Sequence, residues 1–333
     1  TPLTSYYNTI SKDWKIHPLA TVYNAIGYDA INLGNHEFNY GKDILKRYIA
    51  SVQAPVLAAN TVDSMTGQTW AAVKPYVIKT FSLPDGEKLR VGIIGMATPA
   101  IPNFENKENY ANLRFEDQVT MAKKIVAELQ GKVDAIVVVS HSGVEVPGLE
   151  AIDNENQIAA IAQACPQISL IIAGHKHQVL DNDNPAKDAS KKVLYEQNVI
   201  NGVPVVEPGK WGSYLSKAEV AFEKTGDRWQ VTGVHTSNFS TAGVAEDVAI
   251  LALAKPYHAA TLNYLNTKIG VANDAFTAEG ATVRDTALID LVNEVQRHYG
   301  HAQLAAAATF NPKAQIRKGD ITLQDISALY IYE

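Results

Sequence analysis

The chain has 333 residues, of which 46% are hydrophobic and 19% are charged, and its formal net charge at pH 7 is −6. This composition is typical of a folded globular protein, and the length is sufficient for two domains with buried cores. The negative charge argues against a nucleic-acid polymer or an anionic membrane surface as the main partner, because both attract clustered lysine and arginine. No apolar run is long enough to predict a membrane span.

The first half of the chain alternates short apolar segments with segments of helical periodicity, which predicts a layered α/β or α+β sheet. The expected strands are 29–33, 55–60, 89–95, 135–139 and 169–173, and the expected helices are 17–26, 115–129 and 156–164. The last helix leads into Cys165, the single cysteine, so no intrachain disulfide can form. Its apolar surroundings favour a buried small side chain over a nucleophile.

From residue 202 the pattern becomes β-rich, with strands expected at 203–206, 215–222 and 229–234. The turn Pro208-Gly209-Lys210-Trp211-Gly212 carries glycines typical of a backbone that passes close to a site, although an ordinary turn explains them equally well. Residues 244–267 predict the longest helix, which we interpret as an interdomain connector. Beyond it we expect a helix at 286–299, a strand of small residues at 305–308, and a short helix capped by 319–325.

Three polar segments follow predicted strands and contain most of the candidate metal ligands. They are Gly34-Asn35-His36-Glu37, Ser140-His141-Ser142 and Gly174-His175-Lys176-His177. Sheets of this kind place ligands at the carboxyl ends of their strands, so Asn35, His141, His175 and His177 are expected to meet at one edge. Any one histidine alone is as well explained by a strand cap or a satisfied core group. Their joint occurrence favours a metal centre, because imidazole nitrogen and amide oxygen both bind divalent metals.

His36 follows the candidate ligand Asn35 directly, so it would stand beside the metals without binding one. An imidazolium there would stabilise charge on a phosphate ester or donate a proton to the leaving oxygen. Two metals would activate the attacking water and hold the phosphate. We expect Glu37 to fix this loop by hydrogen bonds rather than to bind a metal.

With these motifs in order, the sequence resembles the calcineurin-like metallophosphoesterases of the 5′-nucleotidase family, and among them the bifunctional 2′,3′-cyclic-nucleotide 2′-phosphodiesterase/3′-nucleotidases. The resemblance covers essentially the whole chain and rests on the Gly-Asn-His-Glu, Ser-His-Ser and Gly-x-His-x-His signatures. It implies an α+β four-layer (αββα) metallophosphoesterase sandwich at 1–240, a helical connector at 241–270, and the start of a second α/β domain, an incomplete nucleotide-binding domain, at 271–333.

By position, the resemblance implies that Asn35, His141 and His175 bind one divalent transition metal ion, that His177 binds another, and that His36 is catalytic. The ions would be Mn, Zn, Fe or Co. Tyr332 would be one of two aromatic rings that hold the nucleotide base, with a plain strand-end aromatic as the alternative. The resemblance further implies a monomer that acts on nucleotides and is located in the periplasm, the cell wall or the medium.

Asn39 bears on the substrate. The 5′-nucleotidases typically have an aspartate there, paired with the catalytic histidine. The segment 34–41, with Asn39 at that position, instead resembles the corresponding segment of the cyclic phosphodiesterases. We therefore expect hydrolysis of 2′,3′-cyclic nucleotides to 3′-nucleotides and then to nucleoside and phosphate. An amide cannot stabilise an imidazolium as a carboxylate can, so His36 should be less strongly held in its charged form. The alternatives are a 5′-nucleotidase or broad nucleotide phosphatase and, in another class, an inactive fragment or phosphate-binding module.

Two motifs that the family has before its Gly-Asn-His-Glu signature do not precede that signature here: an Asp-x-His motif and a Gly-Asp motif whose aspartate bridges both metals. Three ligands of one metal site and a single ligand of the other are then present. We expect the sequence to be a truncated representation of a complete enzyme, cut at both ends. A stable protein without the central strands would have to leave sheet edges exposed that must be covered.

Overall fold

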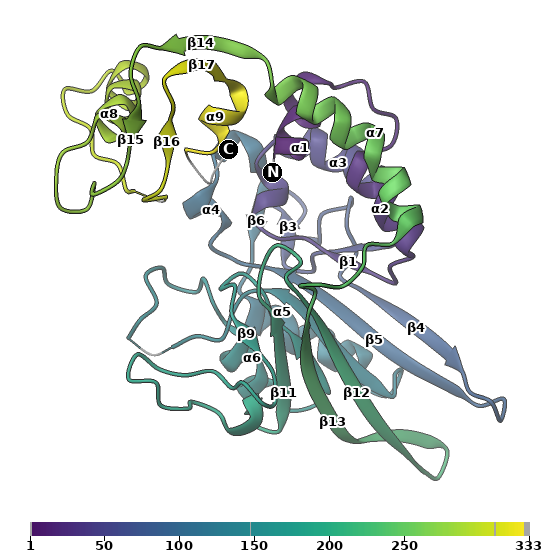
Figure 1. Cartoon of the computed structure of the whole chain (residues 1–333). Coiled ribbons are helices and arrows are strands. Elements are labelled where there is room, and N and C mark those ends of the chain that lie inside the picture. The colour runs from purple at the N-terminus through teal and green to yellow at the C-terminus, as the bar shows by residue number, and fades with distance from the viewer. Residues whose placement is uncertain (1, 147, 310, 330–333) are drawn as a thin grey trace. The chain divides into compact units, whose positions relative to one another are not determined.

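The structure is a computed structural model that describes residues 2–146, 148–309 and 311–329. The chain divides into two compact units: a larger unit, Leu19–Glu246, and a smaller unit that combines Thr1–Pro18 with Asp247–Glu333. Figure 1 traces the elements of both. Within the described ranges, none of the helices combines the length and apolarity needed to cross a bilayer.

The larger unit is built on a seven-stranded sheet with the order β10-β11-β8-β7-β5-β4, in which β9 also pairs with β11. Neighbours among β11, β8, β7 and β5 run parallel, whereas β10, β9 and β4 pair antiparallel. The strands are β4 (Tyr76–Ser82), β5 (Lys88–Ala97), β7 (Ala135–His141), β8 (Leu170–Ile172), β9 (Val179–Leu180), β10 (Val199–Ile200) and β11 (Val203–Pro208).

Three two-stranded sheets complete the β-structure described in the larger unit. They pair β1 (Ile31–Asn32) with β2 (Val56–Leu57), β3 (Thr61–Asp63) with β6 (Leu113–Phe115), and β12 (Tyr214–Thr225) with β13 (Arg228–Ser240). The α-helices are α2 (Pro18–Ile26), α3 (Gly41–Ser51), α4 (Ile101–Phe104), α5 (Gln118–Leu129) and α6 (Ile158–Ala164). The short 3₁₀ turns are η2 (His36–Phe38), η3 (Lys107–Tyr110) and η4 (Glu196–Asn198).

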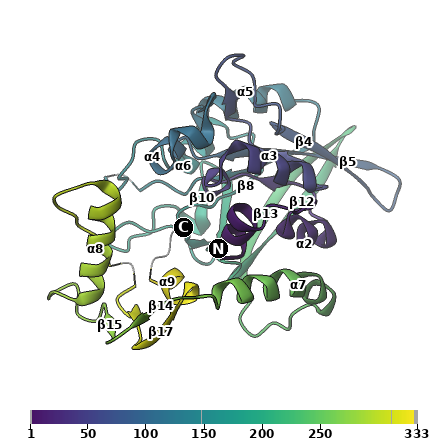
Figure 2. The ribbon, with the colours of Figure 1, turned by 90° about the horizontal axis from the view of Figure 1, so that it is seen from above.

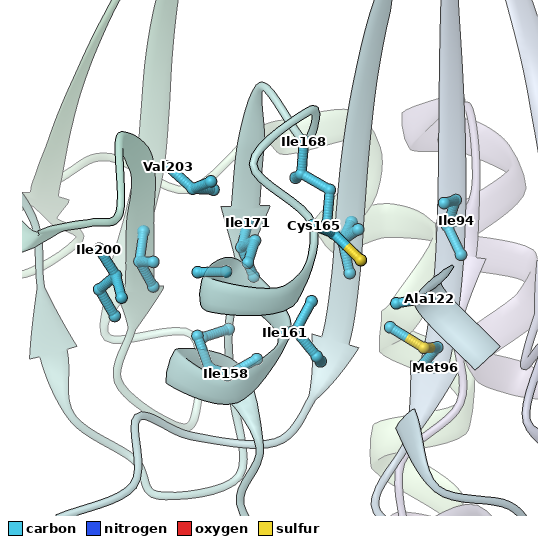
Figure 3. Close-up of a cluster of buried hydrophobic side chains, with 14 of the residues drawn as sticks. Ile94, Met96, Ala122, Ile158, Ile161, Cys165, Ile168, Ile171, Ile200 and Val203 are labelled. Atoms are coloured by element: carbon cyan, nitrogen blue, oxygen red, sulfur yellow. The ribbon is translucent and has the colours of Figure 1, made fainter. Parts of the chain in front are cut away.

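Helices α5 and α6, both labelled in Figure 2, contact each other, and together with the sheet they enclose the main hydrophobic core. The parallel strands are rich in valine and isoleucine, as expected for strands covered on a face by helices. Cys165 lies in this core and is 1% exposed, so the prediction of a buried small side chain is confirmed (Figure 3). At the start of α5, the Asp117 side chain accepts a hydrogen bond from the Thr120 backbone N–H at 2.8 Å.

The parallel register decides where the polar strand ends lie. Ala97 of β5 pairs with His141 of β7, and Val139 of β7 pairs with Ile172 of β8. His141 is therefore level with Gly174, two residues beyond each member of the second pair. Consistent with this register, the Gly174 N–H donates to the Ser142 carbonyl at 3.1 Å.

The smaller unit contains α1 (Pro2–Ser5), a π-helical turn η1 (Tyr6–Ile10) and the long helix α7 (Val248–Leu265). Its remaining elements are β14 (Lys268–Ala272), β15 (Phe276–Thr277), α8 (Ala287–Gly300), β16 (Gln315–Ile316), β17 (Gly319–Thr322) and α9 (Leu323–Ser327). Strand β14 pairs with β17, and β15 with β16. Tyrosine rings of η1 and α7 pack against each other at a tilt of 32°, with the Tyr6 and Tyr264 centroids 5.0 Å apart.

Most expected elements are present, with ends shifted by a few residues, and one is not. The expected cap of the last short helix is a capping box between Thr322 and Asp325. The strand predicted at 305–308 was wrong, because these residues form no helix or strand. Their alanine side chains offer little surface to pack against a neighbouring strand, and β15 pairs with β16 instead.

Candidate active site

Two predicted ligands meet at the carboxyl ends of β1 and β7. His141 Nε2 lies 2.8 Å from Asn35 Oδ1, and both residues are at least partly buried. Gly34 makes this approach possible, because a Cβ added at this position would lie 2.8 Å from ring atoms of His141. The Gly34 N–H donates to Glu37 Oε2 at 2.6 Å, so the prediction that Glu37 fixes this loop by hydrogen bonds is confirmed.

The histidines after β8 lie on a strained turn. His175 and His177 adopt the left-handed conformation, with φ of 71° and 60°. The Lys176 N–H donates to the Gly174 carbonyl at 2.8 Å, which closes a γ-turn around His175. Such conformations cost non-glycine residues about 1–3 kcal/mol and cluster at functional sites. The turn places the His175 ring 5.0 Å from the His141 ring, measured between centroids.

A carboxylate missed by the sequence reasoning holds His175. His175 Nε2 lies 2.7 Å from Glu155 Oε1, and a carboxylate can only accept, so Nε2 is the donor. The Glu155 carbonyl in turn accepts from Thr98 Oγ1 at 2.8 Å. A metal-binding histidine usually donates its second ring N–H to a carboxylate in this way. The arrangement therefore leaves His175 Nδ1 as the nitrogen suited to a metal.

The donor types fit a divalent transition metal, and the distance between two of the donors fits as well. Two donors about 2.1 Å from one metal stand roughly 3 Å apart, close to the 2.8 Å between His141 Nε2 and Asn35 Oδ1. Within the described ranges, no three His, Cys, Asp or Glu side chains converge as a set that could hold a metal ion. The set offered by Asn35, His141 and His175 depends instead on an amide oxygen.

Burial lowers the pKa of His141 to about 3, with further lowering by the charges of His175, His36 and His177. Burial also lowers the pKa of His177, followed in size by the charge of Lys210. Both imidazoles are therefore neutral at pH 7, which is the form that binds metals.

His36 and Asn39 lie on and directly after the 3₁₀ turn η2, whose Phe38 is fully buried. His36 Nδ1 is 2.9 Å from Asn39 Oδ1. Asn39 Nδ2 donates to Glu105 Oε2 at 2.8 Å. The predicted partner of His36 is thus itself bonded to a carboxylate, which the sequence reasoning did not foresee.

The remaining expectations have different outcomes. The Gly209 N–H donates to the Gln178 carbonyl at 2.8 Å, so the turn 208–212 passes beside the His175–His177 segment. Tyr332, the expected base-stacking ring, lies outside the described residues. No motif marked Glu105 or Glu155, and the one available signal was their position in polar loops that follow predicted strands.

Comparison with known proteins gives matches along the chain. Residues 11–179 match the model of the calcineurin-like phosphoesterase family, and residues 268–333 match that of the 5′-nucleotidase C-terminal domain. The chain is 30% identical, over its full length, to the trifunctional nucleotide phosphoesterase protein YfkN of Bacillus subtilis, of which it covers 24%. It is 29% identical, over 96% of its length, to the 2′,3′-cyclic-nucleotide 2′-phosphodiesterase/3′-nucleotidase of Salmonella typhimurium, of which it covers 54%.

Comparison with solved structures also finds phosphoesterases and nucleotidases. The crystal structure of calcineurin-like phosphoesterase YfkN from Bacillus subtilis superposes with a TM-score of 0.70 at 30% identity, and the match covers 79% of this chain and 81% of that one. A putative 5′-nucleotidase from Staphylococcus aureus superposes over the whole chain and 61% of its own, with a TM-score of 0.75 at 23% identity. The expected metallophosphoesterase fold is confirmed.

Proposed function

Because this chain belongs to the calcineurin-like phosphoesterase family, we propose that it carries out metal-dependent hydrolysis of 2′,3′-cyclic nucleotides, first to 3′-nucleotides and then to nucleoside and phosphate. The observation that carries the proposal is the pair His36 and Asn39, 2.9 Å apart, next to the Asn35–His141 contact. Relatives named for this activity are 28–29% identical to the chain, compared with 24–26% for those named 5′-nucleotidase or UshA.

Each residue of the site then has a role. Asn35, His141 and His175 would hold one divalent metal ion, and His177 a second. When bound, the metals supply activation of water and neutralisation of phosphate charge. Glu155 keeps His175 in the tautomer that presents Nδ1. His175 and His177 both have the left-handed backbone conformation, in the turn that follows β8.

His36 acts on the leaving group. In the first step the water oxygen bonds to phosphorus and loses a proton to solvent, the bond from phosphorus to the 2′ oxygen breaks, and protonated His36 gives its proton to that oxygen. His36 then takes up a proton from solvent before the second step. A positioned general acid of this kind contributes about 10²–10⁴-fold to the rate. Asn39 accepts from Nδ1 and so fixes the orientation of the ring. The same groups serve the second step, in which the 3′ oxygen leaves.

The test compares the rates at which the full-length, metal-loaded protein hydrolyses three substrates. We expect 2′,3′-cyclic AMP and 3′-AMP to be hydrolysed faster than 5′-AMP in the presence of Mn²⁺. A preference for 5′-AMP would replace the proposal by 5′-nucleotidase, the candidate favoured by the C-terminal domain match. Phosphate binding without hydrolysis of any of the three would favour a binding module.

Two further expectations accompany this proposal and stay predictions. One is export to the periplasm, the cell wall or the medium, which cell fractionation with an activity assay on each fraction would check. The other is a monomeric protein, which light scattering after gel filtration would check. Binding of nucleotides rather than nucleic-acid polymers agrees with the net charge of −6.

A further inference from the structure

A carboxylate, Glu105, is connected to the candidate catalytic histidine through one intervening side chain, Asn39. Glu105 Oε2 accepts from Asn39 Nδ2 at 2.8 Å, and Asn39 Oδ1 lies 2.9 Å from His36 Nδ1. Glu105 follows the last residue of α4 and is 66 positions away from Asn39 in the chain. The three side chains therefore form a continuous chain of hydrogen bonds from imidazole through amide to carboxylate.

The order of donors and acceptors along this chain is determined from the carboxylate end. An asparagine amide has a donor end and an acceptor end of nearly the same shape, so by itself it can present either one. A carboxylate only accepts, so Glu105 requires Asn39 to turn Nδ2 towards it. Oδ1 must then face His36, and the proton on Nδ1 must be the one donated. Nε2 becomes the ring nitrogen that exchanges a proton.

Glu105 is itself held in place by other contacts. Its second oxygen, Oε1, accepts from the Asn106 N–H at 2.9 Å and from Asn109 Nδ2 at 2.8 Å. Asn109 Nδ2 also donates to the Asn39 carbonyl at 3.1 Å. One oxygen of Glu105 thus anchors the carboxylate to its loop, and the other is directed at the Asn39 amide.

We propose that Glu105 is a positioning residue that sets the tautomer of His36 through the Asn39 amide. This role rests on the catalytic role proposed for His36. It provides, through an amide, the directional control that a carboxylate bonded directly to a histidine would exert. The intervening neutral amide still determines which ring nitrogen of His36 donates. It stabilises positive charge on the ring only weakly, because the charged carboxylate lies one residue further from the ring.

The first test replaces the Glu105 carboxylate, which can only accept hydrogen bonds, by an amide of nearly the same shape. In Glu105→Gln, the new amide can donate or accept, so Asn39 is no longer forced into one orientation. We expect kcat to fall about tenfold and KM to stay within about twofold, as for other groups that orient a catalytic residue. Glu108→Gln is the matched control, since it removes an exposed carboxylate from the same loop. Equal losses in the two variants would overturn the proposal.

A double-mutant cycle gives the sharper result. Asn39→Asp alone places two carboxylates face to face, and we expect about a tenfold loss of kcat. Combined with Glu105→Gln, the new aspartate accepts from both the glutamine and His36, so kcat should return to within about threefold of the parent. Strong coupling of this kind is the signature of residues that act as one unit. Losses that simply multiply in the double variant would contradict the proposal.

A third measurement needs neither metal nor substrate. Long-range ¹H–¹⁵N NMR of the full metal-free chain, with His36→Gln for assignment, reports which ring nitrogen carries the proton. We expect Nδ1–H in the parent and in the double variant, and a mixture of tautomers in Glu105→Gln. A parent spectrum with the proton on Nε2 would overturn the role of Glu105 whatever the substrate is. If the spectra agree but cyclic nucleotides are not hydrolysed, the proposed substrate fails and the positioning role stands.

Discussion

His36 and His175 each have a carboxylate behind them, but they are connected to it differently. His175 donates directly to Glu155 at 2.7 Å, whereas His36 reaches Glu105 through the Asn39 amide. A direct carboxylate fixes the tautomer and also stabilises positive charge on the ring. An intervening amide fixes the tautomer with less charge. The first arrangement suits a histidine that stays bound to a metal, and the second suits one that must release a proton.

The backbones at the two histidines differ as well. His175 sits at φ 71° in a γ-turn, whereas His36 begins a 3₁₀ turn that is followed by Asn39, where φ is −54° and ψ is −28°. The first conformation is strained and depends on its surroundings, while the second is relaxed and is anchored by the buried Phe38. The difference predicts that the His175 turn is the more sensitive of the two to changes in the residues around it.

The largest effects should separate metal binding from turnover. We expect His175→Ala to lose bound metal and with it nearly all activity, because the proposed assignment makes His175 a metal ligand. His36→Ala should retain metal and nucleotide binding and lose about 10²–10⁴-fold in kcat. Metal content by mass spectrometry and nucleotide affinity by calorimetry check the two variants. Unchanged turnover in His36→Ala would remove the distinction between the two histidines.

The partner of His175 should matter for metal affinity. In Glu155→Ala the ring loses its orienting acceptor, and we expect metal affinity to fall about 10–100-fold. Glu155→Gln keeps an acceptor oxygen and should lose less. Glu219→Ala, which changes an exposed glutamate paired with Lys217, is the control. Competition with a coloured chelator measures the affinities, and equal values for Glu155→Ala and the control would show that the direct contact has no such role.

Gly34 and Gly174, each near a strand end, allow a matched test of how closely the His141 ring is packed. Gly34→Ala would place a Cβ 2.8 Å from the His141 ring, whereas Gly174→Ala would place one 3.8 Å from it, an ordinary contact distance. We expect Gly34→Ala to lower the free energy of unfolding by about 1–3 kcal/mol and Gly174→Ala to change it little. Urea titration of the metal-free proteins checks this. The reverse order would mean that the His141 ring moves away at little cost.

The smallest effect concerns the support of the loop that carries Glu155. Burial raises the pKa of Asp117, but hydrogen bonds from Thr120 and Gln157 outweigh it and leave the pKa below its usual value. A lowered pKa stabilises the fold above the unfolded value of about 3.9, and that contribution is lost as pH falls through the folded value. Asp117→Ala should therefore cost about 1 kcal/mol at pH 7.

Melting temperatures of the metal-free parent and Asp117→Ala, measured from pH 7 down to pH 3, check this prediction. The gap between them should narrow once the pH passes below about 4. A gap that stays constant down to pH 3 would contradict a contribution from the ionised carboxyl.

The sequence was sufficient to predict the histidine-bearing strand ends, because apolar runs that end in a histidine are local signals. The pairing of Asn39 with His36 came from the family resemblance rather than from the residues alone, and the structure places the two side chains 2.9 Å apart. The carboxylates could not be predicted in the same way. Glu105 and Glu155 lie 66 and 20 positions from their partners, in loops whose path depends on tertiary packing. The left-handed backbone of His175 likewise carries no signal of its own, because glycine or asparagine usually marks such a position.

Cys165 offers a practical consequence of the way the larger unit is packed. It is the chain's single thiol, lies at the C-terminal end of α6 and is 1% exposed. A thiol reagent can reach it only when the core around α6 opens, so its labelling rate at native pH reports the free energy of that opening. No cysteine has to be introduced or removed for this measurement. The protein therefore contains its own probe of whether metal binding at the sheet edge tightens the core below it.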